Sequence, residues 1–264
     1  MSLVLQAQQI SMRYGKTGAV PLEVIKQVDL SIKKGSFLIL IGPSGCGKST
    51  LLHIMSGMIR PSEGKVLLDG NEITKPDPTK IAMVFQEANL YPWKTVVKNV
   101  EFGLEIRKIP KRERRAKAEK YLDLVGISSF KDYYPSQISG GMQQRVSIAR
   151  ALALETKVIM MDEPFGALDE QSRIILGGEL TKIWEKTGKT IVFVTHSLTE
   201  AAYLSDEIVV MSARPGRLKE VIVNNTKRPR DPESTELGEI RHRLWEHISV
   251  ETMQQYTGSL PLKQ

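Results

Sequence analysis

The sequence has one cysteine, few aromatic residues and no long apolar run. Because Cys46 is the only cysteine, no intrachain disulfide can form, which is typical of a protein in a reducing compartment. The longest apolar stretches, such as Phe37 to Ile41, have the length of one strand, whereas a membrane-spanning helix needs about 18 apolar residues. The first residues lack a basic segment followed by an apolar core, so no export signal is predicted. We therefore expect a cytoplasmic protein.

Acidic residues are outnumbered by basic ones, which gives the 264 residues a net charge of +7. Such a surplus is compatible with nucleic acid, an anionic membrane surface or nucleotide binding, and it does not distinguish among them. Much of the positive charge lies in residues 107–120 and 227–230. In the first segment Ala118, Leu122 and Val125 form an apolar stripe at helical spacing, which favours a solvated helix face.

The most informative stretch is glycine-rich and lies between an apolar strand and an apolar helix. It consists of Gly42, Pro43, Ser44, Gly45, Cys46, Gly47, Lys48, Ser49 and Thr50. Glycines let several backbone N–H groups of such a turn point at one anion, and the helix that follows adds its positive dipole end. At this spacing we expect Lys48 to contact the β- and γ-phosphates of a nucleotide and Ser49 to give its hydroxyl to Mg²⁺.

Strand and helix patterns predict an α/β fold with a mainly parallel sheet. Residues 3–10 and 24–32 are typical of antiparallel strands, and buried strands are expected at 37–41, 81–85, 157–161 and 190–195. From 87 to 138 the patterns are helical, which indicates an inserted helical subdomain. Towards the C-terminus, 207–211 and 218–223 are typical of a hairpin around Arg214 to Arg217, and 236–248 of a helix.

Polar residues follow several of the predicted parallel strands directly. Because ligands of parallel sheets bind at the carboxyl ends of the strands, we expect one site to hold Gly42, Gln86, Asp162, Glu163 and His196. Asp162 is the candidate Mg²⁺ ligand and Glu163 the candidate general base for ATP hydrolysis. Gln86 and His196 are candidates for contact with metal-bound water and the γ-phosphate; alternatively, they are a polar strand cap and a core histidine.

A second glycine-rich helix start lies at Ser139-Gly140-Gly141. It suits a phosphate, yet the first loop already accounts for the nucleotide. If two copies pack head to tail, the second cradle of each chain can close over the γ-phosphate that the other chain holds. The presence of two glycine-rich phosphate cradles in one chain therefore predicts an ATP-dependent homodimer. Tyr14, before the predicted turn at 15–21, is either a base-stacking aromatic or an ordinary turn residue.

With these residues in place, the chain resembles the ATP-binding subunits of ABC transporters from about Leu3 to Met211, with the core of the P-loop NTPases. The motifs are specific in combination: the Walker A loop 42–50, the Q-loop Gln86, a signature at Ile138 to Met142, the Walker B strand Val158 to Asp162 with Glu163, the D-loop Ala167-Leu168-Asp169 and the switch His196. The signature departs from the usual Leu-Ser-Gly-Gly-Gln, because Ile138 replaces leucine and Met142 replaces glutamine.

The resemblance implies a single ATPase domain over 1–264, with a helical subdomain at about 87–138 and a C-terminal extension at about 212–264. It implies that ATP and Mg²⁺ are bound, that Tyr14 stacks on adenine, and that the active unit is a nucleotide-sandwich homodimer. Membrane permease subunits are expected to contact the Gln86 region and the helical subdomain, with a solute-binding protein as an indirect partner. The implied place is the cytoplasmic face of a bacterial membrane.

Three short segments resemble the importers of nitrate, sulfonates, taurine and thiamine precursors: Leu90 to Val96, Ser139 to Arg145 and Ala213 to Arg217. They favour an importer ATPase for a small anion or related solute. One alternative is an exporter or lipid-transport ATPase with the same chemistry. The other is an ABC protein that acts on nucleic acid, but such proteins usually contain two cassettes or a long coiled coil, so no nucleic acid is expected.

Overall fold

The computed structural model describes residues 2–15, 21–166 and 168–257, and side chains as far as Ser249. Internal contacts divide the chain into two compact units. The first unit combines residues 1–76 with 192–264, and the second unit contains residues 77–191.

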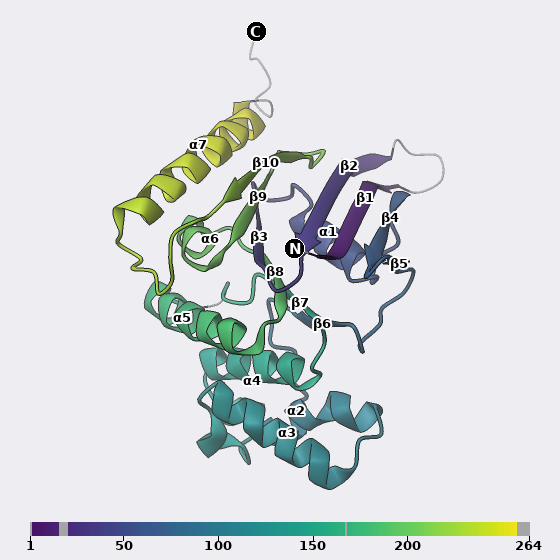
Figure 1. Cartoon of the computed structure of the whole chain (residues 1–264), viewed down its shortest axis with the longest axis vertical. Coiled ribbons are helices and arrows are strands. Elements are labelled where there is room, and N and C mark those ends of the chain that lie inside the picture. The colour runs from purple at the N-terminus through teal and green to yellow at the C-terminus, as the bar shows by residue number, and fades with distance from the viewer. Residues whose placement is uncertain (1, 16–20, 167, 258–264) are drawn as a thin grey trace. The chain divides into compact units, whose positions relative to one another are not determined.

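The N-terminal part of the first unit is an antiparallel sheet with the strand order β2-β1-β4-β5 (Figure 1). Its strands are β1 (Leu3–Tyr14), β2 (Leu22–Lys33), β4 (Glu63–Leu68) and β5 (Asn71–Glu72). The two predicted antiparallel strands are confirmed, and both extend beyond the predicted bounds. Most of the predicted turn between them, residues 16–20, lies outside the described residues.

A second set of strands in this unit has the order β10-β9-β3. The pair of β3 (Phe37–Ile41) and β9 (Glu207–Met211) is parallel, and β9 forms an antiparallel hairpin with β10 (Leu218–Val223). Every residue of β3 and β9 is buried, as expected for parallel strands covered on both faces.

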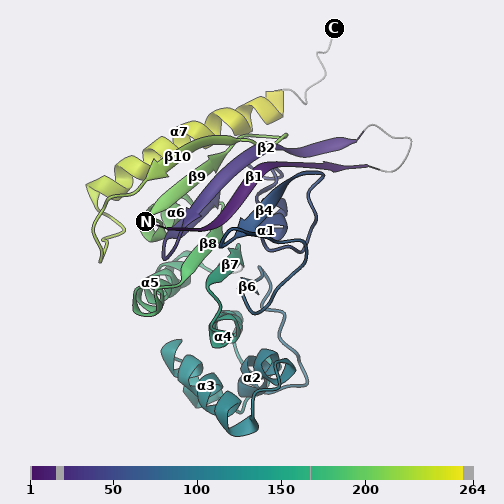
Figure 2. The same ribbon diagram turned by 45° about the vertical axis from the view of Figure 1, so that its right-hand side comes forward.

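The helices of the first unit are α1 (Lys48–Met55), α6 (Leu198–Leu204) and α7 (Thr235–Thr257). Helix α6 contacts both β3 and α7. In Figures 1 and 2, α7 runs alongside β10, where Arg243 forms an ion pair with Glu220 and His247 Nε2 lies 2.5 Å from Glu220 Oε2. None of the helices in the described part of the chain is long and apolar enough to cross a membrane.

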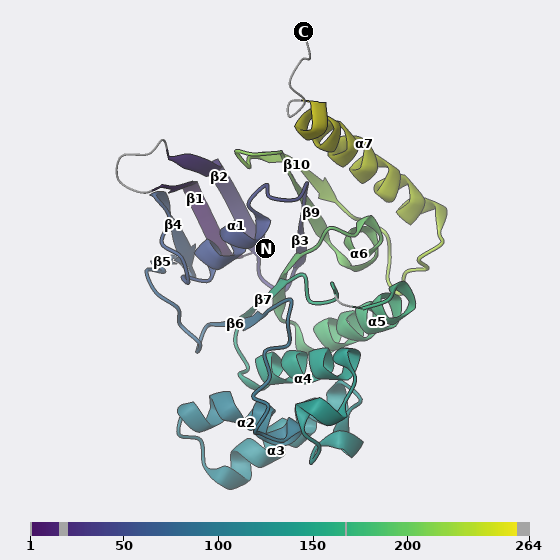
Figure 3. The same cartoon turned by 180° about the vertical axis from the view of Figure 1, so that it is seen from behind.

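The second unit contains the parallel pair of β6 (Ile81–Val84) and β7 (Val158–Asp162). Strand β8 (Thr190–Val194) begins in this unit, where the Thr190 N–H donates to the carbonyl of Lys157 at 3.1 Å. The helices are α2 (Val96–Ile106), α3 (Lys111–Leu124), α4 (Gly140–Ala153), α5 (Glu170–Thr187) and the 3₁₀ turns η1 (Ser128–Phe130) and η2 (Pro135–Gln137). Helices α2, α3 and α4 pack against one another (Figure 3).

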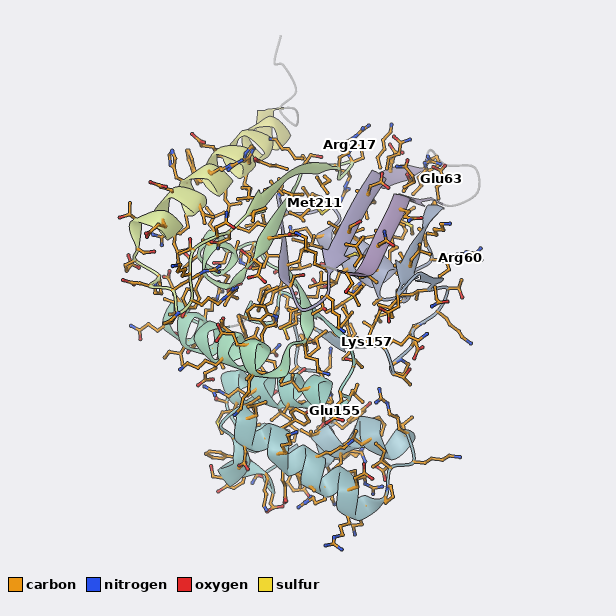
Figure 4. The ribbon with its side chains drawn as sticks, in the orientation of Figure 1. Arg60, Glu63, Glu155, Lys157, Met211 and Arg217 are labelled. Atoms are coloured by element: carbon orange, nitrogen blue, oxygen red, sulfur yellow. The ribbon has the colours of Figure 1, made fainter. Side chains whose placement is uncertain are left out.

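Residues 111–120 of the basic segment lie in α3, and Arg114, Arg115 and Lys117 form ion pairs within the second unit. Arg115 forms ion pairs with Glu101 at 3.1 Å and with Glu119 at 3.2 Å. Lys117 pairs at 3.1 Å with Glu155, which Figure 4 labels where the chain leaves α4. The apolar stripe of this helix, Ala118, Leu122 and Val125, is buried as predicted.

The second basic segment, 227–230, is folded back onto its own unit. The Arg228 guanidinium pairs with Asp206 at 2.6 Å. Arg230 is only 7% exposed, and burial lowers its pKa to about 10. Its guanidinium donates to backbone carbonyls that include those of Tyr203 at 2.9 Å and Ser205 at 2.8 Å. These two arginines therefore stabilise the path of the chain into α7, which accounts for their charge without a partner molecule.

Candidate active site

Residues 42–47 of the glycine-rich stretch form a loop between β3 and α1, and Lys48, the first residue of α1, directs its ammonium into that loop. The Nζ atom donates to the carbonyl oxygens of Gly42 at 2.8 Å and Pro43 at 2.9 Å, and the residue is only 6% exposed. A buried ammonium needs such acceptors, and phosphate oxygens are stronger acceptors than carbonyls. The loop therefore holds a cation where an incoming anion can replace its neutral partners.

Glycines are needed in this loop for two different physical reasons. Gly45 and Gly47 have positive φ angles of +74° and +99°, which favour glycine, and Gly47 is the N-cap of α1. Gly42 instead lies close to β9, because a Cβ atom there would be 2.7 Å from the carbonyl oxygen of Met211. After Gly47 the helix begins, and its first N–H groups have no acceptor within the helix. The loop thus directs backbone donors and the positive end of α1 to the same place.

The switch candidate His196 lies at the edge of the sheet where β3 ends. Strand β8 is next to β3 there, because the Thr195 N–H donates to the carbonyl of Leu40 at 3.2 Å. His196 follows Thr195 and is exposed, whereas Thr195 is buried. The first unit therefore brings His196 to the same end of the strands as Gly42. The alternative of a core histidine does not fit this exposure.

Tyr14 ends β1, opposite Leu22 on β2. The same strand β2 packs against the phosphate loop, since a Cβ atom at Gly47 would lie 3.0 Å from Ile25 Cγ1 and 3.2 Å from Val24 Cγ1. Tyr14 is 41% exposed. Tyr14 therefore lies at the end of β1, and the neighbouring strand β2 is the one that contacts the phosphate loop.

In the second unit, Glu163 and Gln86 lie at the same turn. Asp162 ends β7, and Glu163 follows with a φ angle of +43°, an unusual conformation for a residue other than glycine. Its carbonyl accepts a hydrogen bond from the Gly166 N–H at 3.0 Å. A Cβ atom at Gly166 would lie 3.2 Å from Gln86 Nε2, so the glutamine side chain rests against this turn. A larger residue at 166 would displace it.

Two side chains of α4 hold the segment after β6, and sequence reasoning missed both. Gln144 Nε2 donates to the carbonyl of Phe85 at 3.2 Å. The Arg150 guanidinium donates to the carbonyls of Ala88 at 2.7 Å and Asn89 at 2.8 Å, and burial lowers the pKa of Arg150. The signal that could have found Gln144 is its long polar side chain among mainly small and apolar residues of this helix. These bonds link the backbone around Gln86 to the helix that begins at Ser139.

The signature segment forms an uncovered helix N-terminus. Ser139 is the N-cap of α4, and its Oγ accepts a hydrogen bond from the Met142 N–H at 3.3 Å. Ile138, which replaces the usual leucine, is 8% exposed and belongs to the core. Apart from the helix's own backbone and the neighbours in sequence, no described heavy atom lies within 4 Å of a Cβ position at Gly140, and at Gly141 the described contact is Leu168 Cδ2 at 3.5 Å. The described residues of the second unit therefore leave the space over Gly140 open.

The D-loop is bonded to the start of α5, and Ala167 lies outside the described residues. Arg173, which sequence reasoning did not single out, donates to the carbonyls of Leu168 at 2.9 Å and Gly166 at 3.1 Å. Asp169 caps α5 by accepting from the Ser172 N–H at 2.9 Å, and this backbone hydrogen bond lowers the pKa of the Asp169 carboxyl. The segment after the candidate base is thereby fixed within its unit.

Each unit therefore assembles its own share of the predicted site. The first unit gathers the phosphate loop, Tyr14 and His196, and the second contains Gln86, Asp162, Glu163 and the segment Ser139-Gly140-Gly141. Within the described residues, no group of three or more His, Cys, Asp or Glu side chains is placed to hold a metal ion by itself.

Comparisons with known proteins point to one family. Residues 25–166 match the family model described as ABC transporter. An uncharacterised ABC transporter ATP-binding protein of Methanocaldococcus jannaschii is 50% identical, covering 88% of this chain and 86% of the relative. An aliphatic sulfonates import ATP-binding protein of Bacillus cereus is 42% identical, covering 92% of this chain and 94% of the relative.

A solved structure agrees with these sequence matches. It is a dimeric ATP-binding cassette in a post-hydrolysis state bound to ADP and phosphate, with a TM-score of 0.75 and 34% identity. The match covers 84% of this chain and 100% of that cassette, which confirms the predicted α/β fold class. The chain belongs to the ABC transporter family and is one of its ATP-binding, ATP-hydrolysing subunits.

Proposed function

We propose that this chain powers an ABC importer for a small anion or related solute, of the nitrate, sulfonate or taurine type, from the cytoplasmic face of a bacterial membrane. The main observation in support of ATP-driven transport is the phosphate loop with the buried Lys48 ammonium. Import is supported by the relatives named for aliphatic sulfonates import, which are 41–44% identical to this chain. The proposal treats the chain as one ATPase domain, with 87–138 as its helical subdomain.

The proposed catalytic roles follow from the chemistry of each side chain. Residues 42–50 bind the β- and γ-phosphates through backbone N–H groups and Lys48, and Tyr14 stacks on the adenine. Glu163 accepts the proton of the water that attacks the γ-phosphorus, so that the new P–O bond forms as the bond to ADP breaks. His196 and Gln86 would contact the γ-phosphate and metal-bound water. A general base contributes about 10² to 10⁴ in rate.

Ser49, Asp162 and Gln86 are the proposed holders of Mg²⁺. Their hydroxyl, carboxylate and amide oxygens are the donors this ion prefers, and it is usually bound by one or two carboxylates together with substrate phosphates. The lack of a larger acidic cluster among the described residues agrees with that manner of binding. When bound, the ion neutralises charge on the phosphates. Ser49 lies in the first turn of α1, beside the loop that would hold those phosphates.

We further propose a head-to-tail homodimer in which Ser139, Gly140 and Gly141 of one chain face the γ-phosphate held by the other. The open space over Gly140 supports this assignment, because no described atom outside the helix backbone and the neighbours in sequence lies within 4 Å of a Cβ position there. Solved cassettes similar to this chain are described as dimeric. Permease subunits would contact the Gln86 region and the helical subdomain, and a solute-binding protein would act on the permease.

Sedimentation of Glu163→Gln with and without Mg-ATP tests the catalytic and dimer proposals together. We expect this variant to bind ATP, to lose turnover and to change from monomer to dimer when ATP is added. Adding Gly140→Asp should keep ATP binding and the fold, since a Cβ atom there meets no described atom outside the helix backbone and the neighbours in sequence, but it should prevent dimerisation.

Gly238→Asp in α7 is the matched control, because it adds the same charge far along the chain from the signature. If the mass measured by sedimentation did not change on addition of ATP, although ATP bound, the sandwich dimer would be refuted. Rapid turnover by Glu163→Gln would refute the assignment of the base.

For the importer proposal, the test is ATP-dependent uptake of an aliphatic sulfonate into vesicles that contain this chain, its permease and the solute-binding protein. Efflux instead of uptake would contradict import.

A further inference from the structure

The turn between β9 and β10 lies against the phosphate loop, although the two segments are far apart in sequence. Figure 4 labels Met211 and Arg217, which bound this turn. Inside it, the Arg214 guanidinium donates from Nε at 3.2 Å and from Nη2 at 3.0 Å to the carbonyl oxygen of Gly45, 169 residues away. The neighbouring Gly216 is buried against Cys46, since a Cβ atom at 216 would lie 2.0 Å from the Cys46 carbonyl oxygen.

The turn itself is anchored on its other side to β2. The Gly216 N–H donates to the carbonyl of Val24 at 2.8 Å, and the Gly216 carbonyl accepts from the Lys26 N–H at 3.0 Å. Its geometry is further supported by Ser212, whose Oγ accepts from the Arg217 N–H at 3.0 Å. Arg214 therefore reaches the loop from a fixed base within the first unit.

The contact with Gly45 determines which way a neighbouring N–H group points. In a planar trans peptide the C=O and N–H bonds point in opposite directions. Because Arg214 holds the Gly45 carbonyl on one side of the Gly45–Cys46 peptide, the Cys46 N–H lies on the other side, where it points across the loop to the Pro43 carbonyl at 3.4 Å. That carbonyl also accepts from Lys48, so the Cys46 N–H and the Lys48 ammonium converge on one position.

We propose that Arg214 is a positioning residue of the phosphate loop, which holds the Gly45–Cys46 peptide so that the Cys46 N–H faces the nucleotide phosphates. Arg214 acts through the peptide and does not itself contact ATP. The glycine at 45, with its φ angle of +74°, would otherwise let this peptide rotate at little cost. The inference rests on the proposed role of residues 42–50 as the binding site for the phosphates.

The test compares three variants of the full chain: Arg214→Met, Arg214→Lys and Arg217→Met. Methionine keeps a long aliphatic side chain without a donor, lysine keeps a charged donor, and Arg217→Met removes the same charge from another exposed position of the turn. Calorimetric titration with MgATP and MgADP gives the affinities, steady-state kinetics gives KM and kcat, and amide hydrogen exchange at 44–47 reports the order of the loop.

For Arg214→Met we expect MgATP and MgADP to bind about fivefold more weakly, as for loss of one hydrogen bond at a partly solvated site. KM should rise more than kcat falls, and amide exchange at Cys46 should become faster. Arg214→Lys should restore most of the affinity, and Arg217→Met should match the wild-type chain. A role in stability alone would lower Tm and leave the affinities unchanged.

Two results would overturn the inference: wild-type affinity in Arg214→Met, or an equal loss in Arg217→Met, which would indicate a general effect of charge. If the wild-type chain itself bound no MgATP, the proposed function would fail instead. The wild-type titration therefore separates the failure of the proposed site from the failure of the role assigned to Arg214.

Discussion

Gly216→Ala tests whether the fit between the β9–β10 turn and the phosphate loop sets the affinity for nucleotide. A Cβ atom at this position would lie 2.0 Å from the carbonyl oxygen of Cys46 and 3.1 Å from Met211 Cε. Real Cβ atoms essentially never come closer than 3.0 Å to another heavy atom. The Met211 methyl group can turn aside, but the carbonyl belongs to the backbone. Either the turn or the loop must therefore move by about 1 Å.

The loop is the part that is expected to move, because hydrogen bonds to Val24 and Lys26 hold Gly216 on β2. Forcing an extra methyl group into a packed site typically costs about 1–3 kcal/mol. For a chain of this size, each kcal/mol lowers Tm by about 2–4 °C. A displacement of binding groups by about 1 Å can reduce activity by as much as about 10²-fold. We therefore expect a moderate loss of stability and a larger loss of function, with MgATP affinity reduced by about tenfold or more.

Thermal unfolding and calorimetric titration with MgATP measure the two effects separately. Gly238→Ala is the matched control, because the nearest atom to its Cβ position is Arg241 Nη2 at 3.9 Å and alanine favours helix α7 by up to about 1 kcal/mol. That variant should keep wild-type affinity and a Tm at or slightly above the wild-type value. If Gly216→Ala bound MgATP as tightly as the wild-type chain, the turn would not control the geometry of the loop.

Three further substitutions test single interactions. Lys48→Ala should weaken MgATP binding by about tenfold or more, because a hydrogen bond to a charged group contributes about 1.5–3 kcal/mol; an unchanged affinity in a fluorescence titration would contradict this. Arg150→Met removes the hydrogen bonds to the carbonyls of Ala88 and Asn89 and should lower the free energy of unfolding in urea by about 1–3 kcal/mol. Arg230→Met leaves the carbonyls of Tyr203 and Ser205 without their guanidinium donor, so a similar decrease in the free energy of unfolding is expected. A urea midpoint at the wild-type value would show that water replaces the guanidinium as donor.

Local patterns were sufficient to predict the elements that position the candidate site. The apolar run Phe37–Ile41, followed at once by the glycine-rich stretch, predicts a buried strand and a phosphate loop because both signals lie within neighbouring residues. The same holds for α3, whose buried stripe was visible in the sequence at helical spacing. Strand ends are likewise local, which is why Asp162 and His196 were placed at the ends of β7 and β8.

Short elements and long-range contacts could not be predicted in this way. Helix α6, Leu198–Leu204, is too short to show a helical period against its background and was missed, and α7 extends further at its C-terminal end than the predicted 236–248. The positive φ angle of Glu163 has no sequence signal, because glutamate rarely adopts it. Nothing in the sequence indicates that Arg230 is buried, because its acceptors lie in a part of the chain that no local pattern connects with it.

The shape of the phosphate loop depends on the core of the first unit as much as on its own glycines. Gly42 lies against the end of β9, Gly47 against β2, and Cys46 against the turn that Arg214 and Gly216 belong to. Each contact involves backbone or a buried residue, so the loop is held at each of these points. A flexible glycine loop would pay an ordering cost when phosphate binds. Because β2, β9 and the β9–β10 turn already fix this loop at separate points, much of that cost is met when the unit folds. Substitutions in the turn should therefore alter nucleotide affinity even though the turn itself lies outside the Walker A stretch.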